Sequence, residues 1–410
     1  MADDFAKLNN AIDGYKKEII ELERLLTSIP ALAPENGGDG ESKKVQALKE
    51  YLKKAGFPEG QNYDAPDDRV STKVRPNLVY IIKGEDTSRT VWVMAHTDIV
   101  PPGDLAKWNG EPYTLRVEGD RIFGRGVEDN QHGLVASVFA AKALIDLKIK
   151  PKYNVGLLFV ADEEVGSDFG IAYLLDKHNI FKKEDIILVP DSGDPEGKTI
   201  EIAEKSIVWL RIETTGKQCH ASRPDQGTNA FAAASRLAAK VHALYNVFDH
   251  KDTLFEPPYS TFEPTKKEAN VPNVNTIPGD DVFYIDCRVL PKYKLDEVEA
   301  LIRKWADEIE KSDNVKMKIS HLQRAEAAPP TAANAPVVEA LKRAIRQVYR
   351  VEATVCGIGG GTVAALFRRK GYSAAVWGRI YETAHQPNEY TDVTFIAGDA
   401  KVFAHIFMGA

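Results

Sequence analysis

Cysteine is scarce in this chain of 410 residues. Only three cysteines are present, Cys219, Cys287 and Cys356, and they lie far apart without a CxxC pair. This spacing excludes a small disulfide-stapled fold and a cysteine zinc site, because both need clustered thiols. We therefore expect three reduced thiols that take no part in the chemistry.

Long apolar runs and an excess of basic charge are also missing. No window approaches the roughly 18 apolar residues of a membrane span, and the acidic opening MADDFAKLNN is unlike a signal peptide. With 53 basic and 60 acidic residues the formal charge is −7, and no cluster of Lys and Arg with interleaved aromatics stands out. We expect a cytoplasmic protein with neither a membrane nor a nucleic acid as partner.

Apolar runs that alternate with helical patterns dominate the first half of the chain. Runs of strand length cover residues 78–82, 91–95, 155–161 and 186–189, and residues 133–147 have the apolar spacing of a helix. Continuous apolar runs are typical of strands that are buried on both faces. The pattern predicts an α/β fold, with a mostly parallel sheet and helices on both faces.

A different pattern occupies residues 206–323. An alternating strand begins at Ile207, an Ala-rich helix covers residues 230–244, and further strands and one helix follow. A segment of this size can fold by itself. The sequence thus predicts a discontinuous larger domain, residues 1–205 and 324–410, and an inserted smaller α+β domain, residues 206–323.

Residues with metal-binding side chains follow the predicted strands of the larger domain. His96 and Asp98 come directly after one strand, and Asp129 lies in a glycine-punctuated loop before a helix. A carboxylate beside an imidazole can fix the tautomer that binds a metal. Taken alone, a structural histidine or a helix-capping aspartate explains these residues equally well.

Three consecutive acids, Asp162, Glu163 and Glu164, follow the next strand. A solvated turn is the simpler explanation, yet packed like charges are costly unless a cation neutralises them. Glu163 remains without a ligand role, as the general base of a hydrolase would. Two imidazoles and three carboxylates are enough for two divalent ions that share a bridging carboxylate, and zinc accepts this mixture: His96, Asp129, Glu164, Asp191 and His385.

The motifs HTD, GRGVEDNQHG, DEEVGS, PDSG, HAS-x-P and HQPNEY occur in this order from about Val91 onward. The arrangement resembles the dinuclear zinc-dependent amidohydrolases and exopeptidases that include acetylornithine deacetylase, succinyl-diaminopimelate desuccinylase, aminoacylase and glutamate carboxypeptidase. By this resemblance Asp98 orients His96, Glu163 is the base and proton shuttle, and the peptide bond after Asp129 is cis. The resemblance also implies the ligand sets: His96 and Asp191 on one metal, Glu164 and His385 on the other, and Asp129 between them.

The inserted domain resembles the lid and dimerisation domain of the same family. The resemblance places His220 at the active site of the partner subunit, where it would stabilise an oxyanion. It also implies that Asn275, Arg288 and Thr362 bind substrate, with Arg288 suited to a carboxylate. From the residues alone, Arg288 would be a surface ion-pair residue, and the glycine-rich turn before Thr362 could hold an anion on its N–H groups.

These expectations combine into a homodimeric metallohydrolase that cleaves an amide bond next to a free carboxylate. We expect two divalent metal ions, zinc first, with cobalt or manganese as alternatives. N-acyl amino acid deacylation is the first expectation, and a dipeptidase or carboxypeptidase is the close alternative. A non-catalytic protein that binds amino acids or peptides on the same scaffold is a third hypothesis, which the intact Glu163 disfavours.

Overall fold

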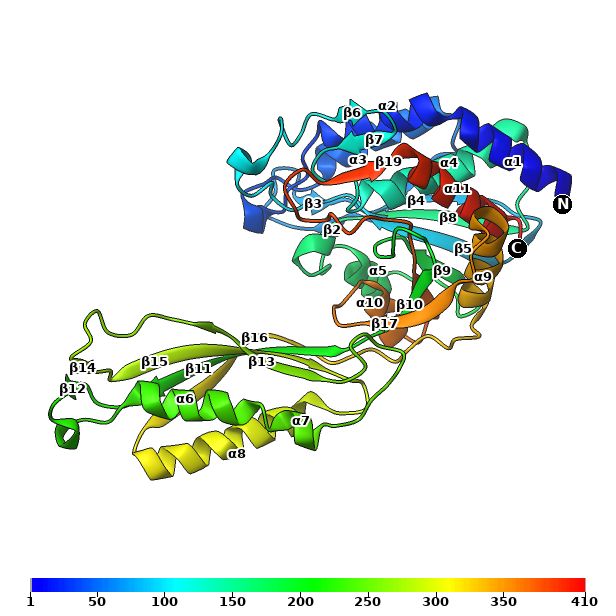
Figure 1. Cartoon of the computed structure of the whole chain (residues 1–410). Helices are drawn as coiled ribbons and strands as arrows, with labels where there is room; N and C mark the ends of the chain where they lie inside the picture. The colour runs from blue at the N-terminus through cyan, green and yellow to red at the C-terminus, as the bar shows by residue number, and fades with distance from the viewer. Residues whose placement is uncertain (1, 410) are drawn as a thin grey trace. The chain divides into compact units, whose positions relative to one another are not determined.

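The computed structural model describes residues 2–409, and the chain divides into two compact units (Figure 1). The larger unit comprises the chain up to residue 202, residues 331–355 and the chain from residue 362. The smaller unit comprises residues 203–330 and 356–361. The catalytic role predicted for one part of the chain and the lid and dimerisation role predicted for the other stay predictions.

An eight-stranded sheet forms the centre of the larger unit, in the order β1-β4-β8-β5-β9-β18-β10-β17. Its central strands β8, β5, β9 and β18 run parallel, whereas β4 and β10 pair antiparallel on either side of them. The predicted α/β class is confirmed. The strands are β1 (Gln61–Asn62), β4 (Leu78–Ile82), β5 (Asp86–His96), β8 (Tyr153–Val160), β9 (Ile186–Val189), β10 (Thr199–Glu204), β17 (Thr354–Ile358) and β18 (Ala374–Val376).

Helices cover both faces of this sheet (Figure 1). Trp92 and Met94 of β5 belong to the apolar cluster that also holds residues of α5 and α10. The alternating residues Val91 and Val93 are equally buried, as a strand between two helical layers requires. The helices are α1 (Ala2–Gly14), α2 (Lys16–Thr27), α3 (Ser42–Lys54), α4 (Gln131–Leu147), α5 (Ile171–Lys177), α9 (Pro336–Tyr349), α10 (Ala364–Arg369) and α11 (Val393–Phe407).

Short strands complete the larger unit. They form a three-stranded sheet, β19-β7-β6, and the pair β2 and β3. Their bounds are β2 (Ala65–Pro66), β3 (Val74–Arg75), β6 (Arg116–Glu118), β7 (Arg121–Phe123) and β19 (Tyr390–Asp392).

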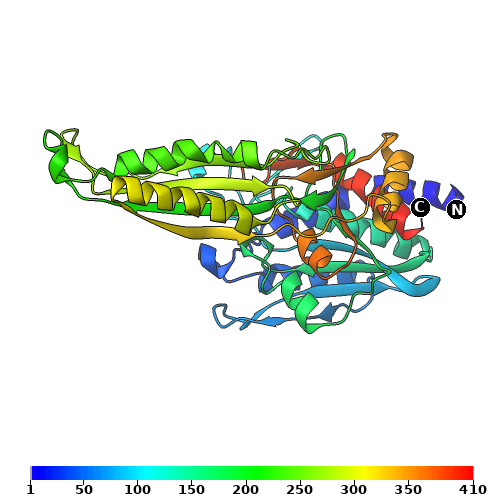
Figure 2. The ribbon, with the colours of Figure 1, turned by 90° about the horizontal axis from the view of Figure 1, so that it is seen from below.

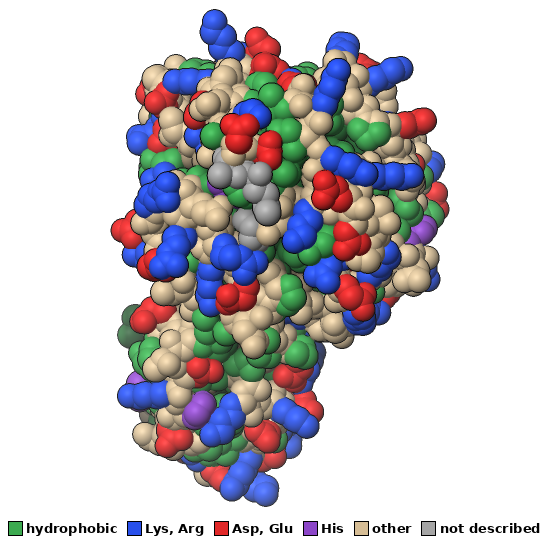
Figure 3. All heavy atoms as spheres, turned by 90° about the vertical axis from the view of Figure 1, so that its right-hand side faces the viewer, with side chains coloured by type: hydrophobic (Ala, Val, Ile, Leu, Met, Phe, Trp, Pro, Cys, Tyr) green, Lys and Arg blue, Asp and Glu red, His purple; other side chains and the backbone are tan. Residues whose placement is uncertain are grey.

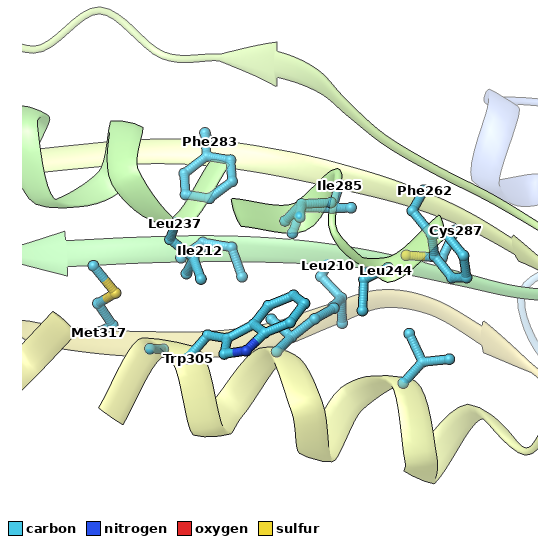
Figure 4. Close-up of a cluster of buried hydrophobic side chains, with 14 of the residues drawn as sticks. Leu210, Ile212, Leu237, Leu244, Phe262, Phe283, Ile285, Cys287, Trp305 and Met317 are labelled. Atoms are coloured by element: carbon cyan, nitrogen blue, oxygen red, sulfur yellow. The ribbon is translucent and has the colours of Figure 1, made fainter. Parts of the chain in front are cut away.

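The smaller unit is a four-stranded antiparallel sheet, in the order β13-β15-β11-β16, with α6 and α8 side by side along it (Figure 2). Residues of β11 and β15 are alternately buried along most of each strand, so one face of the sheet packs on the helices around Trp305 and Phe283 (Figure 4). The elements are β11 (Ser206–Thr215), β12 (Cys219–His220), α6 (Ala230–Val241), α7 (Leu244–Val247), β13 (Thr261–Lys267), β14 (Thr276–Ile277), β15 (Asp280–Val289), α8 (Leu295–Asp313) and β16 (Lys316–Ala325).

Charged side chains of both signs are mixed across the face of the molecule in Figure 3. The three cysteines are free thiols. Within residues 2–409, no helix combines the length and apolar character that crossing a bilayer demands.

Candidate metal centre

Three parallel strands deliver the first residues of the site. His96 is the last residue of β5, Glu163 and Glu164 begin a short 3-10 turn after β8, and Asp191 follows β9. Because β8, β5 and β9 are parallel neighbours, their carboxyl ends meet at the same edge of the sheet. The strand order therefore gathers side chains that lie up to 95 residues apart in the sequence.

Asp129 lies between two imidazoles. Its Oδ1 atom is 2.8 Å from Nε2 of His96, and its Oδ2 atom is 3.0 Å from Nε2 of His385. Asp191 Oδ1 is 3.4 Å from the same nitrogen of His96, and Glu164 Oε2 is 3.1 Å from that of His385. The five predicted ligands thus form two groups that share one carboxylate.

The donor set fits divalent cations. Nitrogen and oxygen ligands about 2.0–2.2 Å from a zinc ion lie roughly 3.3–3.6 Å from one another in a tetrahedral site, slightly farther apart than most of these side-chain atoms. Ligand atoms of His96, Asp129 and Glu164 lie within 4.8 Å of one another, as do those of His96, Glu163 and Asp191. Glu163 therefore lies within reach of the same centre, beside the two groups.

The charges of the site shift the pKa values of its members. Burial alone would lower the pKa of His96, but hydrogen bonds with Asp129, Asp191 and Asp98 outweigh it and raise the pKa well above its ordinary value. Hydrogen bonds with Asp129 and Glu164 raise the pKa of His385 to about 10.

The carboxyl groups respond to burial and to these partners. Burial acts to raise the pKa of Asp129, yet hydrogen bonds with His385 and His96 hold it well below its ordinary value. Burial, and then the charge of Asp191, raise the pKa of Glu163 well above its ordinary value. A carboxyl group with a raised pKa is a stronger base when it is ionised, which suits it to general acid–base chemistry.

Asp98 positions two parts of the site at once. Nδ1 of His96 is 3.1 Å from the carbonyl oxygen of Asp98 and 3.4 Å from its Oδ1 atom, so this nitrogen holds the proton and Nε2 is left to bind a metal. The carboxylate of Asp98 accepts the backbone N–H groups of Glu163 and Glu164, at 3.1 and 3.0 Å. The sequence predicted only the first of these functions.

Glu389 belongs to the hydrogen-bond network of the site, and the sequence analysis missed it. It is fully buried and accepts the backbone N–H groups of Gly126, Glu128 and Asp129, together with Nη1 of Arg125 at 2.6 Å. Burial raises the pKa of Glu389 to about 7. Its position in the motif HQPNEY, as an acid without an assigned partner, is the signal that could have found it.

Glu128 makes the reciprocal contacts. Its carboxylate accepts the backbone N–H groups of Tyr381, at 2.8 Å, of Thr383, and of Ala384, at 3.2 Å. The loop that carries Asp129 and the loop that carries His385 therefore each contribute a carboxylate that accepts backbone N–H groups of the other loop. These hydrogen bonds hold Asp129 and His385 close to each other.

The peptide bond from Asp129 to Asn130 is cis, as the resemblance implies. The side-chain amide of Asn130 donates to the carbonyl oxygen of Pro190, at 2.6 Å, and to Oδ1 of Asp191, at 2.7 Å. Asn130 thus fixes the carboxylate of Asp191. The sequence analysis did not predict this role of Asn130.

The remaining predicted residues take no part in the contacts given above. Thr362 belongs to the larger unit, whereas His220, Asn275 and Arg288 belong to the smaller unit. His220 is exposed, and its Nδ1 atom accepts the backbone N–H of Ser222 at 3.2 Å. The carbonyl oxygen of Asn275 accepts the N–H of the residue after His220, so these two side chains occupy one short ribbon.

Arg288 already has an anionic partner. Its Nε and Nη2 atoms donate to the two carboxylate oxygens of Asp286, at 2.7 and 3.0 Å, and Nη1 donates to the carbonyl oxygen of Gly359 at 2.8 Å. The contact with Asp286 is the ion pair that the residues alone suggested. Substrate binding by Arg288, Asn275 and Thr362 and the catalytic role of His220 stay predictions.

The parallel sheet, and at its edge two imidazoles around a shared carboxylate, fit a metal-dependent hydrolase. A family model described as peptidase family M20/M25/M40 matches residues 92–409, and the chain belongs to this family. It is a metallo-amidohydrolase or metallopeptidase, and membership implies divalent metal ions.

The chain aligns with its relatives over almost its whole length. The chain is 41% identical over 409 residues to an uncharacterized metallohydrolase of Methanocaldococcus jannaschii, a match that covers 95% of this chain and 98% of the relative. It is 28% identical to a succinyl-diaminopimelate desuccinylase of Wolbachia pipientis, over 93% of this chain and 90% of the relative. Human carnosine dipeptidase 1 has the same fold, with a TM-score of 0.73, 18% identity and 98% of each chain covered.

Proposed function

We propose that this protein is a dinuclear metallohydrolase that cleaves an amide bond adjacent to a free carboxylate, with zinc as the first choice of metal. The observation that carries the proposal is the position of Asp129, with one carboxylate oxygen toward His96 and the other toward His385. Asp191 and Glu164 add one carboxylate to each side. Such an arrangement suits two ions bridged by one aspartate.

Bound divalent cations would acidify a water molecule and polarise the scissile carbonyl. Glu163 lies beside the ligands without being needed as one, and its raised pKa suits proton transfer. In the proposed reaction its carboxylate takes a proton from the attacking water. The oxygen of that water forms a bond to the carbonyl carbon, the C–N bond breaks, and Glu163 delivers the proton to the departing amine.

The proposal includes a homodimer. Residues of the smaller unit would complete the site, with His220 stabilising the oxyanion in the other subunit, Arg288 holding the substrate's carboxylate and Asn275 binding the substrate. Thr362 of the larger unit would bind the substrate beside its carboxylate. The support for these roles is the family resemblance of the segments that carry them. An imidazole N–H and a guanidinium are hydrogen-bond donors suited to an oxyanion and a carboxylate.

The first choice of substrate is an N-acyl amino acid. The desuccinylase relative, whose name describes removal of a succinyl group, supports this choice. A dipeptidase or carboxypeptidase is the second candidate, because the same chemistry hydrolyses peptide and acyl amides alike. A protein that only binds such molecules is disfavoured, because Glu163 and the complete ligand set are present.

A panel of substrates and metals tests the proposal. N-acetyl amino acids, N-succinyl amino acids and dipeptides are incubated with the purified protein after reconstitution with zinc, cobalt or manganese, and elemental analysis measures bound metal. We expect close to two ions per chain and fastest hydrolysis of an acyl amino acid. The Glu163→Gln variant, prepared in parallel, identifies contaminating hydrolases. No bound metal after reconstitution would rule out the proposed site.

A further inference from the structure

A buried ion cluster lies behind the acidic turn, residues 162–164. Its centre is Arg75 of β3, whose side chain is 0% exposed. The guanidinium pairs with Glu41, including a bond from Nε to Oε2 of 2.7 Å. Its Nη1 atom is 3.1 Å from Oδ1 of Asp162 and 3.5 Å from Oδ2 of Asp67, and both of these carboxylates are buried.

Asp162 connects this cluster to the site, because the next two residues are Glu163 and Glu164. Its backbone is left-handed, with φ of +67°, a conformation that is unfavourable for a residue other than glycine. Its Oδ2 atom accepts the N–H of Phe169 at 3.0 Å, and its own N–H donates to Glu41 at 3.3 Å. Arg75 and Glu41 therefore hold Asp162 from its side chain and from its backbone.

Asn77 holds the same loop at both of its ends. Its Oδ1 atom accepts the backbone N–H of Ala161 at 3.1 Å, and its Nδ2 group donates to the carbonyl oxygen of Phe169 at 2.9 Å. Asn77 lies two residues after Arg75 and is also fully buried. The segment that holds Arg75 and Asn77 thus fixes the loop of residues 161–169 at its start, at the left-handed Asp162 and at its end.

Burial of one guanidinium among three carboxylates is weak as a source of stability, because desolvation offsets most of the attraction. The contacts do, however, specify one conformation of Asp162. We propose that Arg75 is a positioning residue of the metal centre, which fixes Asp162 and so directs Glu163 and Glu164 toward the other ligands. This inference rests on the proposed function of these two acids.

The test uses Arg75→Lys and Arg75→Met in the full-length chain. Lysine keeps the positive charge but lacks the fork that reaches Glu41 and Asp162 together. Partners one shell behind a metal centre typically contribute 10- to 100-fold in metal affinity or activity. We expect each variant to lose about 10- to 100-fold in kcat with KM unchanged, and calorimetric titration with zinc to show one weakened site and one unaffected site.

Arg368→Lys is the matched control, because Arg368 is equally buried and its Nη2 atom lies 3.3 Å from Glu201, outside the centre. We expect it to lower the melting temperature while kcat and both zinc affinities stay at the wild-type values. Equal losses in the control and in Arg75→Lys would overturn the inference, as would wild-type kcat and zinc binding in both Arg75 variants.

If Arg75→Met fails to fold, Arg75→Lys and Glu41→Gln decide by the same two measurements. If the wild-type protein binds two zinc ions and hydrolyses nothing in the panel, the proposed function fails. The zinc titration still tests the position of Glu164 in that case, so the two failures are distinguishable.

Discussion

The larger and the smaller unit differ in how completely each holds its predicted functional residues. In the larger unit, His96 is 2% exposed and has a hydrogen-bond partner at each ring nitrogen. Asp98, Glu128 and Glu389 each accept backbone N–H groups of the loops that carry the other candidate ligands. In the smaller unit, His220 is exposed. The comparison teaches that the larger unit holds most of the candidate metal ligands in a hydrogen-bonded network, whereas the imidazole of His220 is hydrogen-bonded within its own short loop.

The largest expected effect separates two neighbouring acids of the larger unit. Glu163→Gln should lower kcat by about 10²- to 10⁴-fold, because the proton transfer is lost while the ligands remain. Glu164→Gln should instead weaken one of two zinc sites in a calorimetric titration. The inverse pattern would show that their roles are exchanged, and loss of zinc in both variants would remove Glu163 from the role of base.

The next effect concerns His220 and therefore the smaller unit. Removal of one oxyanion donor typically costs about 10²- to 10³-fold in kcat, so His220→Ala should be nearly inactive yet fully metallated. Sedimentation velocity checks that the variant is still dimeric.

Mixed dimers test whether His220 acts in the other subunit. A heterodimer of His220→Ala with Glu163→Gln would have one site with both defects and one with neither, so part of the activity should return. If demonstrated heterodimers stay inactive, His220 acts within its own chain or has no role, and the contrast between the units disappears.

The same contrast explains what the sequence predicted. Strands β4, β5, β8 and β9 were predictable because each contains a continuous apolar run, and His96, Glu164 and Asp191 were recognisable as candidate ligands because they follow those runs. Strand β13 was missed because most of its residues are exposed and polar, so its pattern carries no alternation. The N-terminal segment forms two helices, α1 and α2, which are separated at Tyr15 directly after Gly14, a residue that weakens a helix.

Part of the site could not be predicted from any pattern in the sequence. Glu128 and Glu389 act by accepting N–H groups from a loop about 260 residues away, and such a contact depends on the path of the folded chain. For Arg288, the sequence showed a cation suited to a carboxylate, and the structure supplies one from Asp286, two residues away. Residue type alone does not distinguish these two partners.

A smaller effect is expected at Arg288, where the carboxylate of Asp286 and the carboxylate of the substrate would compete for the guanidinium. If Arg288 binds the substrate's carboxylate, amidation of that carboxylate should lower kcat/KM by as much as about 100-fold, since a hydrogen-bonded charge contributes up to about 3 kcal/mol. Arg288→Met should reduce the rate for the free acid and leave the rate for the amide unchanged. Asp286→Asn is the control, and it should strengthen binding of the free acid. Equal kcat/KM values for acid and amide with the wild-type protein would exclude the role.

The smallest expected effect concerns acid stability, in which the two units should also differ. His405 of α11 is buried between Gln347 and Asn9, at 2.8 and 3.1 Å, whereas His321 of the smaller unit is exposed. Burial, and then the charge of Lys401, lower the pKa of His405 from 6.5 to about 4. The unfolded chain therefore binds a proton between pH 6.5 and pH 4 that the folded chain does not bind. Stability from this residue is complete above pH 6.5 and falls as the pH decreases toward 4, by about 2 kcal/mol at pH 5.

Chemical denaturation at pH 7 and pH 5 measures this difference. His405→Gln keeps hydrogen-bonding groups but cannot titrate, so the free energy of unfolding of the larger unit should lose about 2 kcal/mol of its pH dependence. His321→Gln is the exposed control for the loss of a histidine. Equal pH dependence in His405→Gln and in the wild-type protein would mean that the acid response of the larger unit arises elsewhere, and the buried carboxylates around Arg75 and Glu389 would then be the residues to replace next.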